Sequence, residues 1–289
     1  MESKSLATPV DVINWGKKVL KEGGIEDFTV SAEILLAHLL GKKRSEILID
    51  NRSETDSGII EKYKKLIKRR LTKEPLQYIT GINEFYNVSI KCDKRALIPR
   101  PETEILCETT LELLKDNNTP KILDIGTGSG AIALALRRNM KKSRIIGTDI
   151  SLDALDLANE NIKVNNVNSG LEFVSGDIFD DSFVKSLGKF DCVVSNPPYV
   201  AENEKEILQP DVIDHEPHVA LFSPGDSLAF YKRIIEITKL LLDPDGLLAF
   251  ETGYDQASKV VELMNERFDS VIVIKDLAGI DRVVTGLAK

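Results

Sequence analysis

The residues best suited to chemistry lie in a short segment, Ser195-Asn196-Pro197-Pro198-Tyr199, that follows an apolar run of strand length. A proline after Asn196 drives the asparagine toward an extended backbone, and each proline removes an N–H donor but keeps its carbonyl acceptor. An amide or amino nitrogen could give one hydrogen to the Asn196 side-chain oxygen and another to the Pro197 carbonyl. Its lone pair would then be directed at a reaction partner, with Tyr199 covering the flat face of the group. The alternative is a proline-rich turn without function.

A glycine-rich turn, Asp124-Ile125-Gly126-Thr127-Gly128-Ser129-Gly130-Ala131, lies directly after the expected strand 121–123 and before an expected helix. Glycines allow a tight turn and let a ligand approach the helix N-terminus without a Cβ between them. Gly126, Gly128 and Ala131 also satisfy the dinucleotide fingerprint. The turn alone therefore does not separate a nicotinamide enzyme from a methyltransferase, and a plain tight turn is a third possibility.

Three acidic residues, Asp124, Asp149 and Asp177, occur near three successive strand ends. We expect Asp124 near the crevice, where a carboxylate would repel a pyrophosphate and favour a cationic sulfonium. Asp149 is placed to bind ribose hydroxyls. Asp177 could accept a hydrogen bond from an adenine amino group while Ile178 packs on the ring. The three acids favour S-adenosylmethionine over NAD, so the nitrogen held by Asn196 would face a methyl group.

The elements that would position these residues alternate between strand and helix after residue 121. This pattern predicts an α/β fold with a doubly wound sheet. The expected strands are 121–125, 144–149, 171–175, 190–195, 246–251, 271–276 and 282–285, and the expected helices are 130–138, 153–165, 227–242 and 255–267.

The chain before this sheet reads as a small helical bundle. Thr8-Pro9 is a helix start, Gly23-Gly24 stops the run, and further helices are expected at 29–40 and 57–71 with a helical turn at 45–48. Phe85, Val88, Ile90 and Cys92 suggest a short strand pair. We therefore expect three segments: a helical domain at 1–83, a β-hairpin linker at 84–98, and the α/β domain at 99–289.

Composition excludes several classes of protein. The 289 residues are 42% apolar and 29% charged, which is typical of a folded chain. No apolar run approaches the roughly 18 residues needed to span a bilayer, so we expect no membrane partner. Residues 1–5 show no secretion signal, and three widely spaced cysteines argue against a disulfide framework, so we expect a cytoplasmic location.

Charge is divided unevenly along the chain. Residues 1–83 hold 15 Lys and Arg against 12 Asp and Glu, a net of +3, whereas residues 84–289 hold 23 against 34, a net of −11. Because binding to a phosphate backbone depends on cations, nucleic acid is disfavoured as the main substrate. Seven cations at 62–73 are interpreted as a solvated helix face, or alternatively as a contact surface for an acidic partner or for ribosomal RNA: Lys62, Lys64, Lys65, Lys68, Arg69, Arg70 and Lys73. His215 and His218 lack a third ligand, so no metal is expected.

The glycine turn together with Asn-Pro-Pro-Tyr resembles class I methyltransferases acting on planar nitrogens, including adenine-N6 DNA methyltransferases. Four further segments narrow the resemblance: Glu74–Gly81, Ile98–Glu104, Glu251-x-Gly253-x-x-Gln256 and Lys275–Arg282. With them, nearly the whole chain is similar to the HemK family, also called PrmC, whose members are peptide chain release factor glutamine N5-methyltransferases. The resemblance implies a class I, Rossmann-like methyltransferase domain with a small N-terminal helical domain.

The resemblance also implies roles for individual residues. The methyl donor S-adenosylmethionine would be bound by Gly126, Thr127, Gly128, Ser129, Gly130, Asp149, Asp177, Ile178 and Asn196. Asn196, Pro197, Pro198 and Tyr199 would hold the substrate glutamine, with Asn196, Pro197 and Tyr199 as the catalytic set. The partner would be a class 1 release factor docked by the helical segment before Gly81. Relatives often carry an aromatic residue at position 178, which is Ile178 here.

Three other functions compete with this one. An adenine-N6 nucleic-acid methyltransferase shares the segment Asn196–Tyr199, but the chain has no large target-recognition insert and its second part is negatively charged. A nicotinamide oxidoreductase explains the glycine turn and Asp149 but gives Asn196–Tyr199 no role. A non-catalytic protein that binds the ribosome or a release factor needs no intact acceptor segment.

Overall fold

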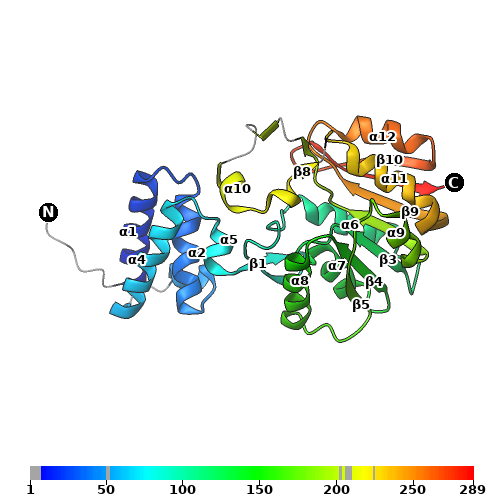
Figure 1. The fold of residues 1–289 in the computed structure, drawn as a ribbon. Helices are drawn as coiled ribbons and strands as arrows, with labels where there is room; N and C mark the ends of the chain where they lie inside the picture. The colour runs from blue at the N-terminus through cyan, green and yellow to red at the C-terminus, as the bar shows by residue number, and fades with distance from the viewer. Residues whose placement is uncertain (1–7, 50–52, 202–203, 206–209, 224) are drawn as a thin grey trace. The chain divides into compact units, whose positions relative to one another are not determined.

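The computed structural model describes residues 8–49, 53–201, 204–205, 210–223 and 225–289 (Figure 1). Residues 1–5, the basis of the expectation about secretion, lie outside these ranges. The chain forms two compact units, Met1–Gly81 with Pro210–His215, and Ile82–Gln209 with Glu216–Lys289. The segment Pro210–His215, which the sequence analysis assigns to the α/β domain, thus belongs to the helical unit. No helix in the described part of the chain is long and apolar enough to cross a membrane.

The first unit is built from helices whose ends carry recognisable capping signals. Thr8 forms a capping box with Asp11, and the side chain of Asp56 accepts the N–H groups of Gly58 and Ile59. The predicted helices at 8–22, 29–40 and 57–71 are confirmed, whereas the short α5 was not expected. The helices are α1 (Pro9–Glu22), α2 (Phe28–Leu40), α3 (Arg44–Ile49), α4 (Ser57–Leu71), α5 (Leu76–Thr80) and α10 (Pro210–His215).

A tyrosine on α4 organises the core of this unit. Tyr63 is fully buried and donates its hydroxyl hydrogen to the Ala32 carbonyl at 3.0 Å. A Cβ on Gly16 of α1 would lie 2.0 Å from the Tyr63 oxygen, so only glycine leaves room for the ring. The three long helices are therefore joined at one side chain.

Arg70 does not belong to a solvated basic face. It is 7% exposed and its guanidinium pairs with Asp27 at 2.9 Å and with Asp211 at 3.3 Å, and it also donates to the Ser31 hydroxyl and the Glu74 carbonyl. The interpretation of the run 62–73 as one solvated face is wrong at this position. Position 70 falls on the inward side of α4, together with Tyr63 and Ile67, because residues three and four apart share a helix face.

The second unit contains a seven-stranded sheet in the order β10-β11-β9-β6-β3-β4-β5. All strands run parallel except β11, which is antiparallel to both of its neighbours. The predicted α/β sheet is confirmed. Its strands are β3 (Lys121–Ile125), β4 (Arg144–Asp149), β5 (Leu171–Ser175), β6 (Phe190–Ser195), β9 (Leu242–Glu251), β10 (Phe268–Lys275) and β11 (Asp281–Ala288).

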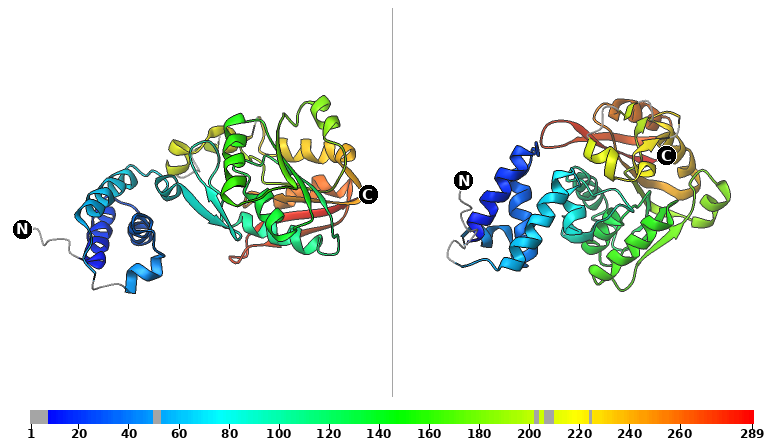
Figure 2. Two further views of the ribbon diagram at one scale, coloured as in Figure 1. Left: turned by 90° about the horizontal axis from the view of Figure 1, so that it is seen from below. Right: turned by 60° about the vertical axis from the view of Figure 1, so that its left-hand side comes forward.

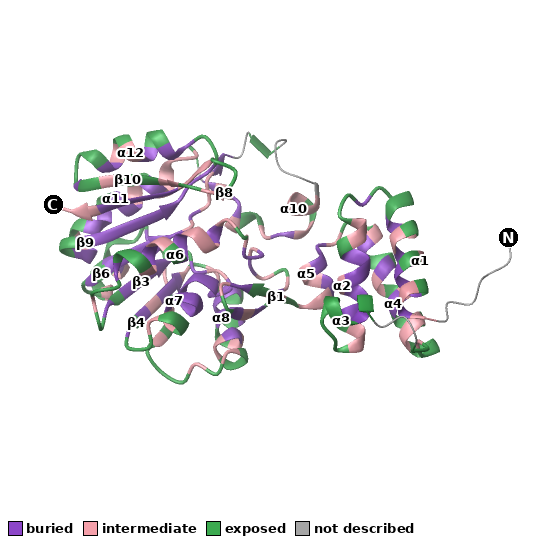
Figure 3. Cartoon of the chain, turned by 180° about the vertical axis from the view of Figure 1, so that it is seen from behind, coloured by how far each residue is buried: buried purple, intermediate pink, exposed green. Residues whose placement is uncertain are grey.

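Helices cover both faces of this sheet (Figure 2). Helices α7 and α8 lie on one face, where α6 contacts α7, and α9, α11 and α12 lie on the other, where α11 contacts both α9 and α12 (Figure 2). Figure 3 shows that the buried residues concentrate in the central strands. The helices are α6 (Thr103–Leu113), α7 (Ala131–Asn139), α8 (Leu152–Val164), α9 (Asp181–Leu187), α11 (Ala229–Leu241) and α12 (Ala257–Asn265). Helices α6 and α9 were not expected from the sequence.

A hairpin of β1 (Ile82–Phe85) and β2 (Val88–Lys91) precedes the sheet, and two asparagines hold β2: Asn165 bonds the Ser89 backbone in both directions, and Asn161 bonds that of Lys91. The Asn161 side chain of α8 accepts from the Lys91 N–H at 2.7 Å and donates to the Lys91 and Ser129 carbonyls at 3.2 and 3.0 Å. Because Ser129 belongs to the glycine-rich turn, this one side chain fixes the turn against the hairpin.

We expect Arg70→Leu to lower the free energy of unfolding of the helical unit by about 1–3 kcal/mol, because it leaves Asp27 and Asp211 without their cation. The lower part of this range reflects the partial exposure of both carboxylates. Urea unfolding measures the effect, and Lys68→Leu, an exposed cation on the same helix, is the control. Equal stability of the two variants would contradict the structural role of Arg70.

Candidate active site

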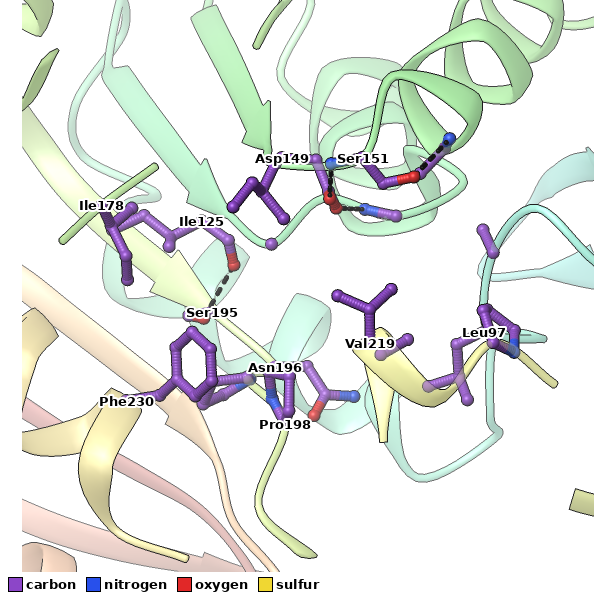
Figure 4. A pocket seen from close by; sticks show the side chains of 18 of the residues that line it. Leu97, Ile125, Asp149, Ser151, Ile178, Ser195, Asn196, Pro198, Val219 and Phe230 are labelled. Atoms are coloured by element: carbon purple, nitrogen blue, oxygen red, sulfur yellow. Dashed lines mark hydrogen bonds between the residues drawn. The ribbon is translucent and has the colours of Figure 1, made fainter. Parts of the chain in front are cut away.

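A cavity of about 760 Å³ opens at the carboxyl ends of β3, β4, β5 and β6 (Figure 4). The sheet order reverses between β3 and β6, because the chain passes from β3 outward to β5 and returns to β6. Open α/β sheets bind ligands at this kind of switch point. The four segments that follow these strands hold most of the residues singled out by the sequence.

Gly126 and Gly128 form the wall of the cavity that follows β3. Their φ angles are +72° and +55°, a region that favours glycine. A Cβ on Gly126 would meet nothing within 4 Å, and one on Gly128 only Ala96, at 3.9 Å. The turn therefore leaves open space in which a ligand can approach the backbone closely.

The other three predicted residues of the turn do not line the cavity. Thr127 donates its hydroxyl hydrogen to Asp124, and Ser129 is buried with its carbonyl bonded to Asn161. Gly130 has φ +81°, and a Cβ there would lie 2.6 Å from the Phe173 ring. These residues shape the turn from behind, since the backbone must pack closely against β5 and the helices.

Asp149, at the end of β4, lies in the cavity wall and holds the glycine turn in place. Its Oδ2 accepts from the Gly128 N–H and its Oδ1 from the Ser151 N–H, both at 2.9 Å (Figure 4). Burial raises the pKa of Asp149, while the backbone hydrogen bonds lower it. Each oxygen keeps a lone pair, so the carboxylate can still accept hydrogen bonds from a ligand diol.

The segment after β5 contributes a mixed polar and apolar wall. Asp177 lines the cavity and accepts from the Phe179 N–H through Oδ1 at 2.8 Å. Ile178 is 6% exposed and lies between the cavity and the core. Phe179 and Phe230 also line the cavity, with ring centroids 5.5 Å apart and nearly perpendicular planes. This wall suits a flat aromatic ligand.

Sequence reasoning missed both phenylalanines. Phe179 follows Ile178 directly and belongs to the same motif, so its position in the sequence could have identified it as a cavity residue. Phe230 comes from α11, 51 residues further along, and nothing local connects it to the motif. Together they supply the aromatic surface that Ile178 lacks.

Asp124 does not reach the crevice, so that expectation is wrong. Neighbouring residues of a strand point to opposite faces of the sheet, and Ile125 is the one that lines the cavity. Asp124 is fully buried, and its Oδ2 accepts from the Thr127 hydroxyl at 2.6 Å. Burial raises the pKa of this carboxyl to about 7. Asp124 therefore caps the turn internally.

The acceptor segment after β6 lies across the cavity from the glycine turn. Ser195, Asn196, Pro197 and Pro198 all line the cavity. Ser195 donates its hydroxyl hydrogen to the Ile125 carbonyl at 2.7 Å (Figure 4). The side-chain nitrogen of Asn196 donates to the Thr103 hydroxyl at 3.2 Å. With Nδ2 bonded there, Oδ1 is the atom of the amide left for a ligand.

Tyr199 is not brought to the cavity surface. Its carbonyl accepts from the Gln256 side-chain nitrogen at 2.8 Å, and its ring packs against the core of the second unit. A Cβ on Gly253 would lie 3.2 Å from this ring. Burial raises the pKa of Tyr199 to about 12, so the phenol is neutral. Tyr199, Gly253 and Gln256 thus form a support behind the acceptor segment.

The two histidines considered as a metal pair belong to different units. His215, at the end of α10, lies with its ring nitrogen 3.4 Å from the Thr72 carbonyl. His218 lines the cavity and contacts the Phe222 ring edge to face. Within the described ranges no three His, Cys, Asp or Glu side chains form a group that could hold a metal ion.

Two domain families match the chain, the PrmC N-terminal domain at residues 11–81 and the Methyltransferase small domain at residues 103–241. A "Release factor glutamine methyltransferase" from Clostridium acetobutylicum is 39% identical over 92% of this chain and 93% of its own length. One of the same name from Thermodesulfovibrio yellowstonii is 42% identical over 88% and 90%. The solved hMettl16 catalytic domain, in complex with MAT2A 3'UTR hairpin 6, shares the fold with a TM-score of 0.57 at 16% identity; the match covers 87% of this chain and 91% of that one.

The sheet order, the glycine turn and the cavity at the switch point define a class I methyltransferase, an enzyme class that uses S-adenosylmethionine. The relatives match nearly the whole length, including the helical unit. The chain belongs to the family of release factor glutamine methyltransferases.

We expect Asp149→Ala to weaken binding of S-adenosylmethionine about 10- to 150-fold, because loss of the carboxylate removes about 1.5–3 kcal/mol of hydrogen bonding to the ribose and the glycine turn. Calorimetric titration of the donor measures this change. Asp153→Ala, an exposed acid in the first turn of α8, is the matched control. Unchanged donor affinity in Asp149→Ala, or binding of NAD to the wild type, would contradict the assignment.

Proposed function

We propose that this protein transfers the methyl group of S-adenosylmethionine to the side-chain amide nitrogen, N5, of the glutamine in the Gly-Gly-Gln motif of class 1 peptide chain release factors. The observation that carries the proposal is the position of Asn196 and Pro197 in the cavity wall, across from the glycine turn, in a member of this family. The proposal makes the chain a protein methyltransferase that acts on translation termination.

The residues of the cavity fit the methyl donor. Open space above Gly126 and Gly128 accommodates its amino acid part, and Asp149 offers two acceptors to the ribose. Asp177 and Ile178, with Phe179, suit the adenine. When bound, the donor supplies an electrophilic methyl group on a cationic sulfur.

The acceptor segment supplies the electrostatics of the reaction. An amide nitrogen is a weak nucleophile because its lone pair is delocalised, and positive charge develops on it as the new bond forms. Asn196 Oδ1 and the Pro197 carbonyl accept the two N–H groups of the glutamine and stabilise that charge. Their fixed position also aligns the nitrogen with the methyl carbon. No strong base is needed, since the methylated amide cation is acidic.

Pro198 and Tyr199 have different tasks in this mechanism. Pro198 lines the cavity and would contact the aliphatic part of the glutamine. Tyr199 acts from behind, since its carbonyl bond to Gln256 holds the segment against the core. We therefore assign both residues the role of shaping the substrate site.

An adenine-N6 nucleic-acid methyltransferase is the second candidate, because an exocyclic amino group fits the same acceptors. The net charge of −11 over residues 84–289 and the match to the PrmC N-terminal domain favour the protein substrate. We infer no DNA substrate. A cytoplasmic location is part of the proposal, and the free, buried state of Cys92, Cys107 and Cys192 is compatible with it.

The helical unit is proposed to dock the release factor. The acceptor site can hold only one small planar group, so most of the recognition energy must come from surfaces away from the reacting atoms. The exposed cations of α4, such as Lys62, Lys65 and Lys68, offer one such surface.

Incubating the protein with S-adenosylmethionine and a release factor should add one methyl group to the glutamine of the Gly-Gly-Gln motif, as read by mass spectrometry of the peptide. Asn196→Ala should lower kcat about 100-fold or more, because its oxygen interacts more strongly with the developing cation than with the neutral amide. Donor affinity should change far less. Wild-type turnover in this variant, or methylation of duplex DNA instead, would contradict the proposal.

Removing residues 1–72 should leave donor binding nearly intact while kcat/KM for an intact release factor falls steeply. The kcat/KM for a short Gly-Gly-Gln peptide should fall much less, because the peptide has no surface that docks on the helical unit. Donor titration serves as the test that the second unit still folds. A truncated chain that binds the donor and modifies the release factor as efficiently as the full chain would refute the docking role.

A further inference from the structure

The direction of the Asn196 side-chain amide is set by what lies behind it. A carboxamide presents a donor at one end and an acceptor at the other, with nearly the same shape, so its neighbours decide which end faces the cavity. The proposed function, on which this inference rests, requires the oxygen to face the substrate nitrogen. Nδ2 is bonded to the Thr103 hydroxyl at 3.2 Å, in agreement with that requirement.

Thr103 accepts this bond through an oxygen lone pair, and its own hydroxyl hydrogen must then point away from Asn196. The residue is the first of α6, is 4% exposed, and is fixed by its N–H bond to the Arg100 carbonyl at 3.1 Å. A hydroxyl has a single hydrogen, so its direction is coupled to that of its neighbours. An acceptor behind Thr103 would fix the direction of the Thr103 hydroxyl and, through it, that of the Asn196 amide.

Glu251 supplies that acceptor. It ends β9, and since Ser195 pairs with Phe250 in parallel register, Glu251 lies beside Asn196 at the adjoining strand end. The side chains of Thr103 and Asn196 lie close enough to the Glu251 carboxyl to lower its pKa by hydrogen bonding, and the residue is 3% exposed. Its Oε2 is buried without a hydrogen-bond partner among the described residues, so acceptor capacity remains.

We propose that Glu251, acting through the Thr103 hydroxyl, is a positioning residue that keeps the oxygen end of the Asn196 amide directed at the methyl-accepting nitrogen. When Thr103 donates to Glu251, its oxygen can only accept from Asn196. Without that acceptor the hydroxyl can donate to Oδ1, and the amide can turn. Asn196 would then present N–H groups to the N–H groups of the glutamine.

Ionisation of Glu251 strengthens its effect on the direction of the Thr103 hydroxyl and the Asn196 amide. Burial raises its pKa to about 7, against the lowering effect of the two hydrogen bonds and of the Arg282 charge on β11, while Glu102 before α6 raises it. The neutral groups around it are the Tyr199 phenol and the Cys107 thiol on α6, and Tyr231 donates to the Glu251 backbone carbonyl. An ionised carboxylate can only accept, whereas a protonated one can also donate to Thr103 and permit the wrong direction. Turnover should therefore rise as the pH passes through about 7.

The test uses the full-length protein and four variants. Glu251→Gln keeps the shape but adds a donor, and Thr103→Val removes the hydroxyl. Thr103→Ser restores the hydroxyl. Thr110→Val is the matched control, because Thr110 is a fully buried threonine of the same helix whose hydroxyl bonds the Leu106 carbonyl of its own helix. For each we would measure kcat and KM with a release factor, donor affinity by calorimetry, and the melting temperature.

We expect kcat to fall about tenfold or more in Glu251→Gln and Thr103→Val, while KM and donor affinity stay within about threefold, since the lost interaction belongs to the transition state. Thr103→Ser should recover most of the turnover, and Thr110→Val should retain it. The rise of wild-type kcat near pH 7 should be absent from Glu251→Gln. Because Asp124 also has a pKa of about 7, this comparison assigns the titration to Glu251.

Wild-type turnover and an unchanged pH profile in Glu251→Gln and Thr103→Val would overturn the inference. So would parallel losses of kcat, donor affinity and melting temperature that Thr103→Ser does not recover, since these indicate a purely structural role. Failure of the wild type itself to methylate the release factor would overturn the proposed function instead, and the two failures are thereby distinguished.

Discussion

The parallel pairing of β3 with β6 is the constraint on which the site depends. The glycine turn continues β3 and the acceptor segment continues β6, so their pairing holds the donor side and the acceptor side of the cavity next to each other. The bond from the Ser195 hydroxyl to the Ile125 carbonyl extends the pairing by one further contact at the cavity wall. Methyl transfer needs two ligands aligned within a few tenths of an ångström, and two hydrogen-bonded strands provide a rigid frame for this.

Two buried carboxyls, Asp124 and Glu251, and the partly buried Asp149 stand at the same end of the sheet, and desolvation raises the pKa of each. An acid whose pKa in the folded state exceeds the unfolded value contributes less to stability as the pH rises from about 4 toward 7. These groups therefore oppose folding near neutral pH. Each has a structural or chemical use that explains its retention: Asp124 caps the turn, Asp149 holds Gly128, and Glu251 lies behind Asn196.

Local patterns predicted most of the fold and the two motifs of the site. The start signal Thr8-Pro9 and the stop signal Gly23-Gly24 marked the first helix, and apolar runs marked the strands. The rest depends on contacts between distant segments. The inward direction of Arg70 and of Asp124 follows from which face packs against a neighbour, and Phe230 reaches the cavity from another helix. The position of Glu251 beside Asn196 requires the β6–β9 register, and that of Thr103 requires the packing of α6 on β9; no short stretch of sequence contains either.

The central claim is that the cavity holds a glutamine amide between the acceptors of the segment after β6 and the methyl donor. The most direct measurement is a crystal structure of the full-length protein with S-adenosylhomocysteine and a Gly-Gly-Gln peptide. The account predicts the glutamine nitrogen within hydrogen-bond distance of Asn196 Oδ1 and the Pro197 carbonyl, facing the donor sulfur. A glutamine bound away from these two oxygens, or an Asn196 amide whose nitrogen faces the glutamine, would contradict it.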